Sequence, residues 1–309
     1  MSRIHEALKK AELERAAAPP VGAGGTLLDP QVVLPSVAHN GGTAAATRET
    51  KPAGPADQES PFRFSDLQAR HRAHHNWNPD PNSDVFSAKQ SSHGAEQFRT
   101  LRSRLYQLRG SQALKSVLIT SSMTGEGKTF VTANLVRALV RQAERRVLMI
   151  DADLRRSRLH VLFGAPSSPG LSDYLRGSCD ELSVIQRGET DNLCFIPGGS
   201  QMSDPSELLS NGRLKTLLER MGPAFDWIII DSPPCLPVAD PGVIAHVCDG
   251  VLLVVRAEYT PSEVILKSRR ELKDRNILGV VLNAVAEGAM AYSSYYAYGY
   301  QSNEAQVQK

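Results

Sequence analysis

The feature that most constrains this chain is a glycine-rich loop between an apolar run and an amphipathic segment. The loop reads Ser121-Ser-Met-Thr-Gly-Glu-Gly-Lys-Thr129, directly after the apolar residues 116–120. Residues 131–141 then carry apolar side chains at helical spacing. A strand, a glycine turn and a helix in this order predict a loop whose backbone N–H groups face a phosphate. An ordinary glycine-rich turn is the alternative, and Gly-Lys-Thr in this context disfavours it.

The residue types inside the loop suggest how a phosphate chain would be held. Gly125 and Gly127 allow the tight bend, and the start of the helix adds a partial positive charge. Lys128 can reach the outer phosphates, and the Thr129 hydroxyl is placed for Mg²⁺. Ser122 stands where the usual pattern has its first glycine.

Two further apolar runs end in carboxylates. Residues 146–150 lead into Asp151-Ala-Asp153, and residues 227–230 lead into Asp231-Ser-Pro-Pro. Ligands of open α/β sheets bind at the carboxyl edge of the strands, so these acids are candidates for binding Mg²⁺ and for taking a proton from an attacking hydroxyl. For Asp151 and Asp153 alone, a capped strand-to-helix turn, with Asp153 capping a helix through Leu159, is equally consistent with the pattern.

Strands and helices alternate over the second half of the chain. The pattern predicts an α/β fold, a mostly parallel sheet with helices on both faces. Asn283 closes the last predicted strand, where its amide could contact a base or simply sit in a turn. The remaining predicted strands cover residues 193–197, 251–255 and 278–282, and the predicted helices cover 170–175, 205–221 and 261–273.

Residues before the predicted sheet have a different composition. Residues 1–18 read as a short amphipathic arm, either a docking helix or a solvated segment. Residues 19–88 are rich in Pro, Gly and Ala and predict a disordered linker. Within that linker, residues 71–75 hold three histidines, which without nearby acidic or cysteine companions favour a solvated basic patch over a metal site. The sequence therefore predicts a folded domain over residues 89–288 and a tail over 289–309.

Overall composition excludes several classes of protein. The formal net charge of +2 does not predict a nucleic-acid partner, and the four scattered cysteines show no metal-binding spacing. No apolar run reaches the ~18 residues of a spanning helix, and the N-terminus lacks a signal peptide's apolar core. We therefore expect a cytoplasmic protein that reaches the membrane through a partner.

A second helix, over residues 92–108, precedes the glycine loop. Glu96, Arg99 and Arg102 follow one another at intervals of three. Glu96 and Arg99 can pair within the helix. Alternatively, the two arginines meet acidic groups of a neighbouring subunit, and spacing alone does not decide between these interpretations.

Tyrosines crowd the C-terminal end. Five of the eight tyrosines of the chain lie there, among Ser, Ala and Gly without a helical or strand pattern. One interpretation is nonspecific stacking. The other is a mobile substrate whose phenols enter an active site and gain ~1.5–2 negative charges with each phosphate. These five residues are Tyr292, Tyr295, Tyr296, Tyr298 and Tyr300.

Together these motifs resemble the bacterial tyrosine kinases of exopolysaccharide and capsule synthesis, whose catalytic domain has a P-loop NTPase fold of the MinD/ParA-like type. The resemblance covers about residues 89–300, and the opening Met-Ser-Arg-Ile-His-Glu resembles the kinases of exosortase-type loci. The wider group of partitioning ATPases has a lysine near the start of its phosphate loop. Met123 occupies that place here, as a non-lysine does in the tyrosine kinases.

The resemblance implies roles for individual residues. Asp151, Asp153 and Asp231 would organise the metal and activate the tyrosine hydroxyl, with Lys128 as the fourth catalytic residue. Thr129, Asp151 and Asp231 would hold Mg²⁺. Glu96, Arg99 and Arg102 would close a ring of subunits, so that each tail is phosphorylated by a neighbour. ATP would be bound by Thr124, Gly125, Glu126, Gly127, Lys128, Thr129, Phe130 and Asn283.

The same resemblance implies partners. These are a separate membrane protein of the chain-length-determinant type as activator, further copies of the chain in a ring, and a protein-tyrosine phosphatase. Two other functions stay open at this point. One is a MinD/ParA-like ATPase switch that positions partners without phosphorylating tyrosine, and the other is an adaptor that has lost catalysis. The tyrosine tail and Met123 favour the kinase over the switch, and the intact lysine and aspartates disfavour the adaptor.

Overall fold

The structure is a computed structural model of the 309-residue chain. It describes residues 62–70, 77–86, 93–188, 190–202 and 204–286. The chain divides into two units after residue 60, and every described residue belongs to the second. The predicted arm, the three-histidine segment and the tyrosine tail therefore lie outside the described residues.

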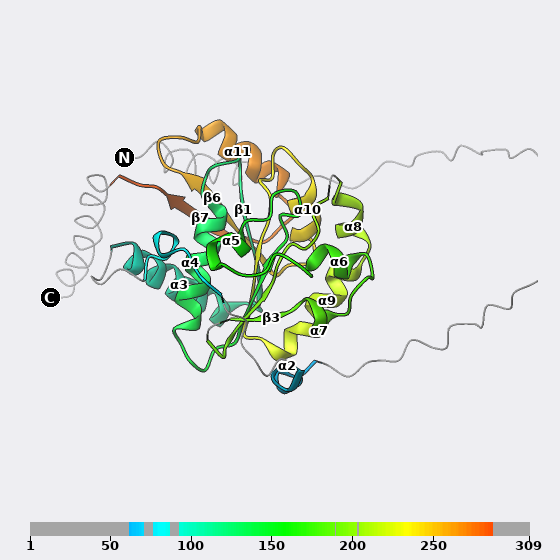
Figure 1. The fold of residues 1–309 in the computed structure, drawn as a ribbon. Coiled ribbons are helices and arrows are strands. Elements are labelled where there is room, and N and C mark those ends of the chain that lie inside the picture. Colours follow the sequence, from blue (N-terminus) through cyan, green and yellow to red (C-terminus); the bar gives the residue numbers. More distant parts are fainter. Residues whose placement is uncertain (1–61, 71–76, 87–92, 189, 203, 287–309) are drawn as a thin grey trace, which may run out of the picture. The chain divides into compact units, whose positions relative to one another are not determined.

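A single seven-stranded sheet forms the centre of the described unit (Figure 1). Its strand order is β3-β4-β2-β5-β1-β6-β7, and every neighbouring pair is parallel except the short β3–β4 pair. The prediction of a mostly parallel α/β sheet is confirmed. The strands are β1 (Ser116–Ser121), β2 (Val147–Asp151), β3 (Gln186–Arg187), β4 (Leu193–Ile196), β5 (Trp227–Asp231), β6 (Gly250–Arg256) and β7 (Ile277–Asn283).

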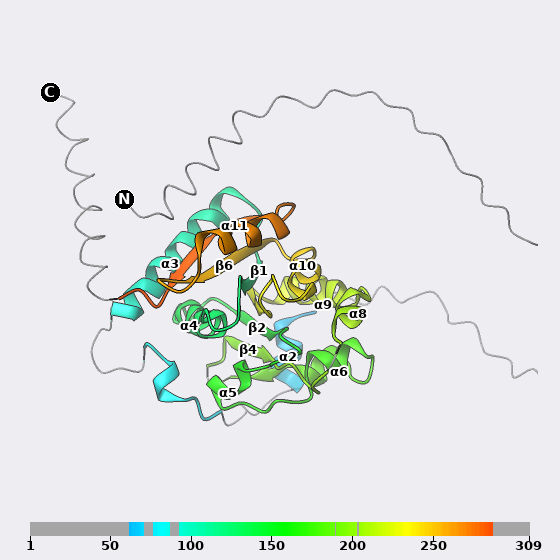
Figure 2. The same cartoon turned by 90° about the horizontal axis from the view of Figure 1, so that it is seen from above.

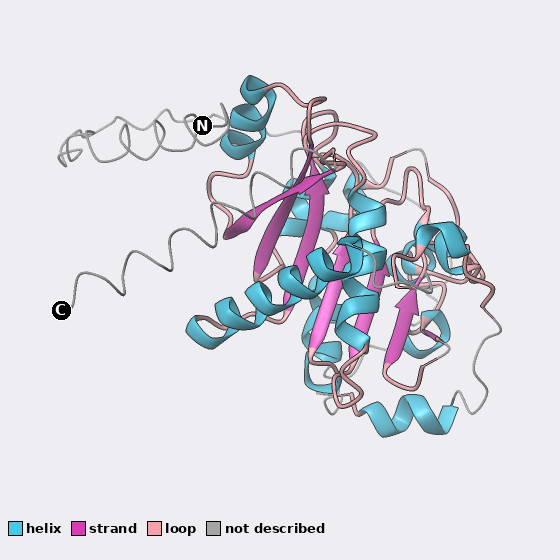
Figure 3. Cartoon of the chain, turned by 90° about the vertical axis from the view of Figure 1, so that its left-hand side faces the viewer, coloured by secondary structure: helices cyan, strands magenta, loops and turns pink. Residues whose placement is uncertain are grey.

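Helices enclose the strands, as Figure 3 shows. Alternate residues of each strand face opposite sides, so Val117 and Ile119 of β1 join one apolar core while Leu118 joins the other. The first core includes apolar residues of α3 (His93–Ser111), α4 (Lys128–Val140) and α5 (Leu159–Phe163). The second includes residues of α2 (Phe64–Arg70), α6 (Leu171–Leu175), α7 (Glu181–Val184), α8 (Ser206–Ser210), α9 (Arg213–Met221), α10 (Asp240–Ala245) and α11 (Ser262–Glu271). In Figure 2, α8 lies beside α6, α9 and α10.

The single helix predicted over residues 205–221 is two helices. α8 ends at Ser210 and α9 begins at Arg213, because Gly212 between them has a φ of +84°. That left-handed conformation interrupts the helical path and suits glycine. The leucines of both pieces still reach the same core, so the apolar pattern alone did not reveal the break.

The predicted linker also ends earlier than its composition suggests. Phe62, Phe64 and Leu67 are buried against the sheet, and the Arg146 guanidinium lies 4.5 Å from the Phe64 ring centroid. Trp77 packs edge-on to Phe195 at 5.9 Å between ring centroids. The boundary at residue 88 is therefore wrong: residues 62–70 and 77–86 belong to the folded unit. These few large side chains show no periodicity, so local sequence gave no sign that they pack.

Besides α2 in the predicted linker, three short elements had no counterpart in the sequence analysis, namely the antiparallel β3 and the one- to two-turn helices α7 and α10. Each contains too few residues to display a period. Within the described ranges, no helix combines the length and apolarity needed to cross a lipid bilayer.

Candidate nucleotide-binding site

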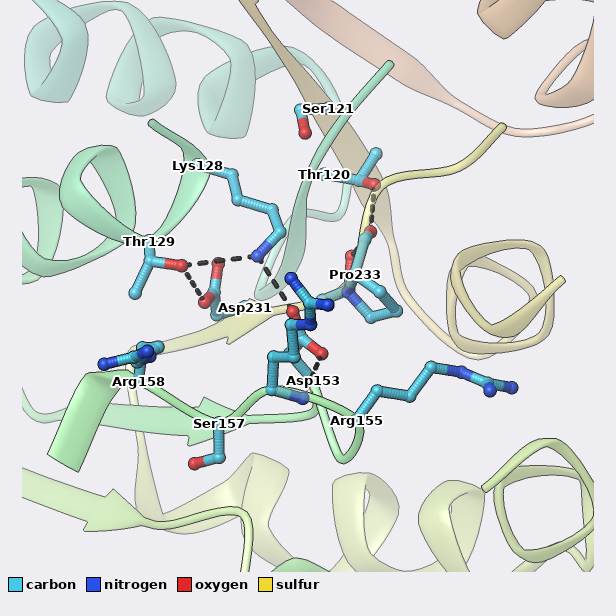
Figure 4. Close-up of polar contacts among 12 residues, drawn as sticks. Thr120, Ser121, Lys128, Thr129, Asp153, Arg155, Ser157, Arg158, Asp231 and Pro233 are labelled. Carbon is cyan, nitrogen blue, oxygen red and sulfur yellow. Dashed lines mark hydrogen bonds and ion pairs between the residues drawn. The ribbon is translucent and has the colours of Figure 1, made fainter. Parts of the chain in front are cut away.

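The carboxyl ends of β1, β2 and β5 bring the predicted site residues together. β2 and β5 are paired so that Asp151 lies opposite Asp231, and β1 runs beside β5 into the glycine loop. Figure 4 shows Lys128 reaching across this edge toward the acids. Its ammonium lies 3.0 Å from a carboxylate oxygen of Asp153. Residues that are far apart in sequence thus form one charged cluster around the start of α4.

The glycine loop is shaped before any ligand binds. Gly125 and Gly127 have φ angles of +86° and +88°. A Cβ on Gly127 would lie 2.0 Å from the Asn283 amide nitrogen, so this position requires glycine. The buried Glu126 carboxylate accepts a hydrogen bond from the Met123 N–H at 2.6 Å and another from the Thr260 hydroxyl. No side chain caps the start of α4, which leaves its first N–H groups for an anion.

Asp231 is held by two threonines of α4. The Thr129 hydroxyl donates to one carboxylate oxygen at 2.7 Å, and the Thr132 hydroxyl donates to the other at 3.1 Å. Thr132 was missed by the sequence analysis. Its position three residues after Thr129, on the same side of a helix, is the signal that could have identified it.

Asp151 is fixed by the loop that follows β2. One of its carboxylate oxygens accepts hydrogen bonds from the Ser157 hydroxyl at 2.6 Å and from the N–H groups of Arg158 and Leu159 at 3.0 Å each. The capped-turn interpretation is therefore correct in kind, but Asp151 rather than Asp153 accepts the N–H groups at the start of α5. Asp153 accepts the N–H of Arg156 at 2.9 Å on one carboxylate oxygen and the Lys128 ammonium at 3.0 Å on the other. Asp151 is thus already oriented, with its other oxygen bonded only to the Asp153 N–H at 3.2 Å.

Burial and the charges of neighbouring carboxylates raise the pKa values of Asp151 and Asp231. Burial first, and then the charge of Asp231, raises the pKa of Asp151 to about 7. Burial likewise raises the pKa of Asp231, although Lys128 and Thr129 oppose the shift. For Lys128, burial disfavours the charged form, but Asp231, Asp153 and Asp151 outweigh it and raise the pKa. The cluster carries more negative charge than its one ammonium balances, which suits a cation.

We expect the ligand-free chain to lose stability as the pH rises. Asp151 has a pKa of 3.8 as an ordinary carboxyl and about 7 when folded, so between these values the folded state binds the extra proton. Unfolding releases that proton, and the free energy of unfolding therefore falls with rising pH, by up to a few kcal/mol. Melting temperatures in EDTA between pH 5 and pH 8 measure this slope. Asp151→Asn should flatten it, and an equal slope in both proteins would contradict the assignment.

The remaining predicted residues lie as follows. Asn283 donates its amide to the Glu126 carbonyl at 2.9 Å, which places it against the glycine loop. Thr124 is exposed at the loop, whereas the Phe130 ring packs 6.3 Å from that of Phe98. The contacts of these residues to a nucleotide, including that of Asn283 to a base, stay predictions.

On α3, Glu96 and Arg99 pair within the helix, which is one of the two interpretations that their spacing allowed. Glu96 and Arg99 form an ion pair, and Arg102 donates to the Ala138 carbonyl of α4 at 2.7 Å. Both members of the ion pair keep exposed surface, so a neighbouring subunit could still reach them. The role of these residues in a ring stays a prediction.

The cluster fits a magnesium-bound phosphate chain. Across the described part of the chain, no group of three or more His, Cys, Asp or Glu side chains is arranged to hold a metal unaided. Mg²⁺ characteristically takes only one or two carboxylates and completes its shell with water and phosphate. Thr129, Asp151 and Asp231 match that requirement. The buried Ser122 hydroxyl, which has no partner among the described residues, adds a polar group within the loop.

Comparison with known proteins agrees with this geometry. Residues 117–298 match the family model of the CobQ/CobB/MinD/ParA nucleotide binding domain. The chain is 33% identical over 211 residues to tyrosine-protein kinase YwqD of Bacillus subtilis strain 168, covering 68% of this chain and 88% of YwqD. It is 35% identical over 216 residues to tyrosine-protein kinase ptk of Acinetobacter johnsonii, covering 68% of this chain but only 29% of that protein.

A solved structure shows the same fold. The kinase domain of Escherichia coli tyrosine kinase ETK superposes with a TM-score of 0.64 at 32% identity, covering 74% of this chain and 89% of that domain. The residues of this chain that match the family model, 117–298, include the glycine loop and the acidic strand ends described above.

Proposed function

Because the chain belongs to the family of bacterial tyrosine-protein kinases, we propose that it is an ATP-dependent protein-tyrosine autokinase. Its substrate is the C-terminal tyrosine cluster of a neighbouring copy, and its role is to regulate polymerisation or export of an exopolysaccharide or capsule. The observation that carries the proposal is the convergence of Lys128, Asp151 and Asp231 at the start of α4, in a chain with five tyrosines between residues 292 and 300.

The side chains supply the parts of a phosphoryl transfer. The loop N–H groups and the Lys128 ammonium hold the outer phosphates of ATP, while Thr129, Asp151 and Asp231 hold Mg²⁺ directly or through water. Mg²⁺ held by these residues would neutralise charge that develops on the phosphates. The phenol oxygen forms a bond to the γ-phosphorus as the bond to the bridging oxygen breaks, and ADP leaves. Asp151, oriented by the Ser157 hydroxyl and the N–H of Arg158, takes the phenol proton.

Several finer features belong to the same proposal. Glu96, Arg99 and Arg102 close a ring, so that a tail reaches the site of the next subunit. Phosphorylated tails repel one another and loosen that ring. A separate membrane protein of the chain-length-determinant type activates the kinase and holds it at the membrane, and a phosphatase reverses the modification. The family to which the chain belongs supports these features.

We expect incubation with ATP and Mg²⁺ to produce phosphotyrosine in the C-terminal peptide. Replacing the five tail tyrosines with Phe should remove most of that signal, because Phe lacks the accepting oxygen. Mass spectrometry of the intact chain and of its C-terminal peptide measures both results. The activator's cytoplasmic segment is added as a positive control.

Absence of phosphotyrosine, together with ATP hydrolysis at the same site, would instead support the MinD/ParA-like switch. Phosphotyrosine retained by the five-Phe chain would move the acceptor to Tyr106, Tyr174 or Tyr259. Tyr259 is the most accessible of these three, with 51% of its surface exposed.

A further inference from the structure

A cavity lies next to the Asp151 carboxylate, outside the glycine loop. Its volume is about 570 Å³, and its walls are the loop after β2, the loop after β4 and the segment before α6. Sites of about 300–1,000 Å³ are typical for small ligands. No residue of the glycine loop lines the cavity, so it is adjacent to the phosphate loop but separate from it.

Two arginines give this cavity an uncompensated positive charge. Arg156 and Arg158 both line it and are both exposed. Neither guanidinium forms a hydrogen bond or ion pair with any residue that the structure describes, and no acidic side chain lines the cavity. The preceding residue, Arg155, does not line the cavity. Its guanidinium forms an ion pair with Asp240 at 2.7 Å. Figure 4 shows Arg155 and Arg158 extending to opposite sides of Asp153.

The remaining walls offer hydrogen-bond donors. They include the hydroxyls of Ser167 and Ser168 and the amide of Gln201, one hydrogen of which is donated to the Arg155 carbonyl. The Ser157 and Ser200 hydroxyls also line the cavity, but they donate to Asp151 and Asp173. His160 also lines the cavity, and its Nδ1 lies 3.3 Å from the Ser157 hydroxyl. Two guanidinium groups with several hydroxyls form a donor set that fits a phosphate dianion better than a single carboxylate.

Ser157 links the cavity to the catalytic centre. The same hydroxyl that lines the cavity donates to Asp151 at 2.6 Å. A ligand in the cavity therefore lies beside the place where the proposed reaction produces a tyrosine phosphate. A chain that brings one phenol to Asp151 could place a nearby residue of the same segment against Arg156 and Arg158.

The tail provides such a segment. Its five tyrosines fall between residues 292 and 300, separated by one to three positions. An extended chain advances about 3.3 Å per residue, so neighbouring tyrosines are on the order of 3–10 Å apart along the backbone. One tail can thus present a phosphate and an unmodified phenol to adjoining sites.

We propose that the cavity walled by Arg156, Ser157 and Arg158 binds a tyrosine phosphate already formed in the tail, while an unmodified tyrosine of the same tail occupies the catalytic position. This inference rests on the proposed kinase function. Its consequence is sequential modification, in which the first phosphate improves binding of the tail for the next transfer.

Synthetic peptides test this binding without requiring catalysis. Two peptides cover residues 288–303, one unmodified and one with phosphate on Tyr296, and each binds to the full chain carrying the five tail Tyr→Phe changes. Fluorescence anisotropy in ADP and Mg²⁺ measures the affinities. We expect the phosphopeptide to bind at least about tenfold more tightly than the unmodified one. Arg156→Gln with Arg158→Gln should remove that difference, while Arg270→Gln, an exposed change on α11, should keep it.

Other outcomes overturn the inference. These are equal affinity for the two peptides, a preference that survives the double substitution, or displacement of the phosphopeptide by inorganic phosphate at equal concentration. A large loss of ADP affinity in the double variant would also overturn it, because the arginines would then belong to the nucleotide site. Failure of the kinase proposal is separate: it is the absence of phosphotyrosine after incubation of the unaltered chain with ATP.

Discussion

Lys128→Met is expected to reduce tyrosine phosphorylation by about 10²–10³-fold, the usual effect of removing one preorganised donor from a transition state. The Lys128 ammonium is the cation of a salt bridge to Asp153 at 3.0 Å, and the three acids raise its pKa. Methionine keeps the length of the side chain but not its charge. Without that charge, the outer phosphates face the carboxylates uncompensated. Phosphotyrosine formed per minute, measured by mass spectrometry, gives the size of the loss.

Lys267→Met is the matched control for this change. Lys267 is exposed on α11 and makes no hydrogen bond or ion pair with any residue in the described ranges. The control should retain full activity, and both variants should melt within a few degrees of the parent chain. A Lys128→Met chain that keeps more than a tenth of the parental rate would contradict the assignment of the phosphate loop.

Arg155→Ala is expected to cost about 3 kcal/mol of folding free energy. Arg155 donates to both carboxylate oxygens of Asp240, at 2.7 and 3.1 Å, and Asp240 is fully buried. Removing the partner of a buried charge is more costly than removing an exposed one. Because Arg155 itself is 30% exposed, we take the lower end of the usual range. For a unit of this size the melting temperature should fall by roughly 5–10 °C.

The neighbouring arginine provides the comparison. Arg156 is exposed and unpaired within the described part of the chain, so Arg156→Ala should change stability by less than about 0.5 kcal/mol. The double change Arg155→Ala with Asp240→Ala should cost less than the sum of the two single changes, because both remove one interaction. Additive costs in thermal unfolding would show that the pair does not contribute as described.

The sequence predicted the strands and the acids at their ends because each strand is buried on both faces and reads as an unbroken apolar run. Asp151 and Asp231 could therefore be assigned to one edge before any coordinates. The pairing of Arg155 with Asp240 could not, since 85 positions separate them and no local pattern links them. Phe64 and Trp77 were missed for a related reason: their burial depends on the shape of the surface that receives them.

Contacts between separate segments also limited the prediction of the site itself. The sequence between Asp151 and Arg158 indicated a turn, but it did not show that the N–H groups at the start of α5 would fix the Asp151 carboxylate. Thr132 was within reach of helical spacing, whereas the cavity beside Ser157 is formed by three loops that meet only in the folded chain.

The Glu126 carboxylate ties Met123 and Thr260 together across the mouth of the loop. Because the glycine loop is already held in one conformation, it loses little conformational entropy when a nucleotide binds. Affinity at this site should then depend mainly on charge and metal, and exchange of ADP for ATP should proceed without a slow ordering step. If the proposed function holds, regulation of this protein would act on the presentation of a tail to the site more effectively than on closure of the loop.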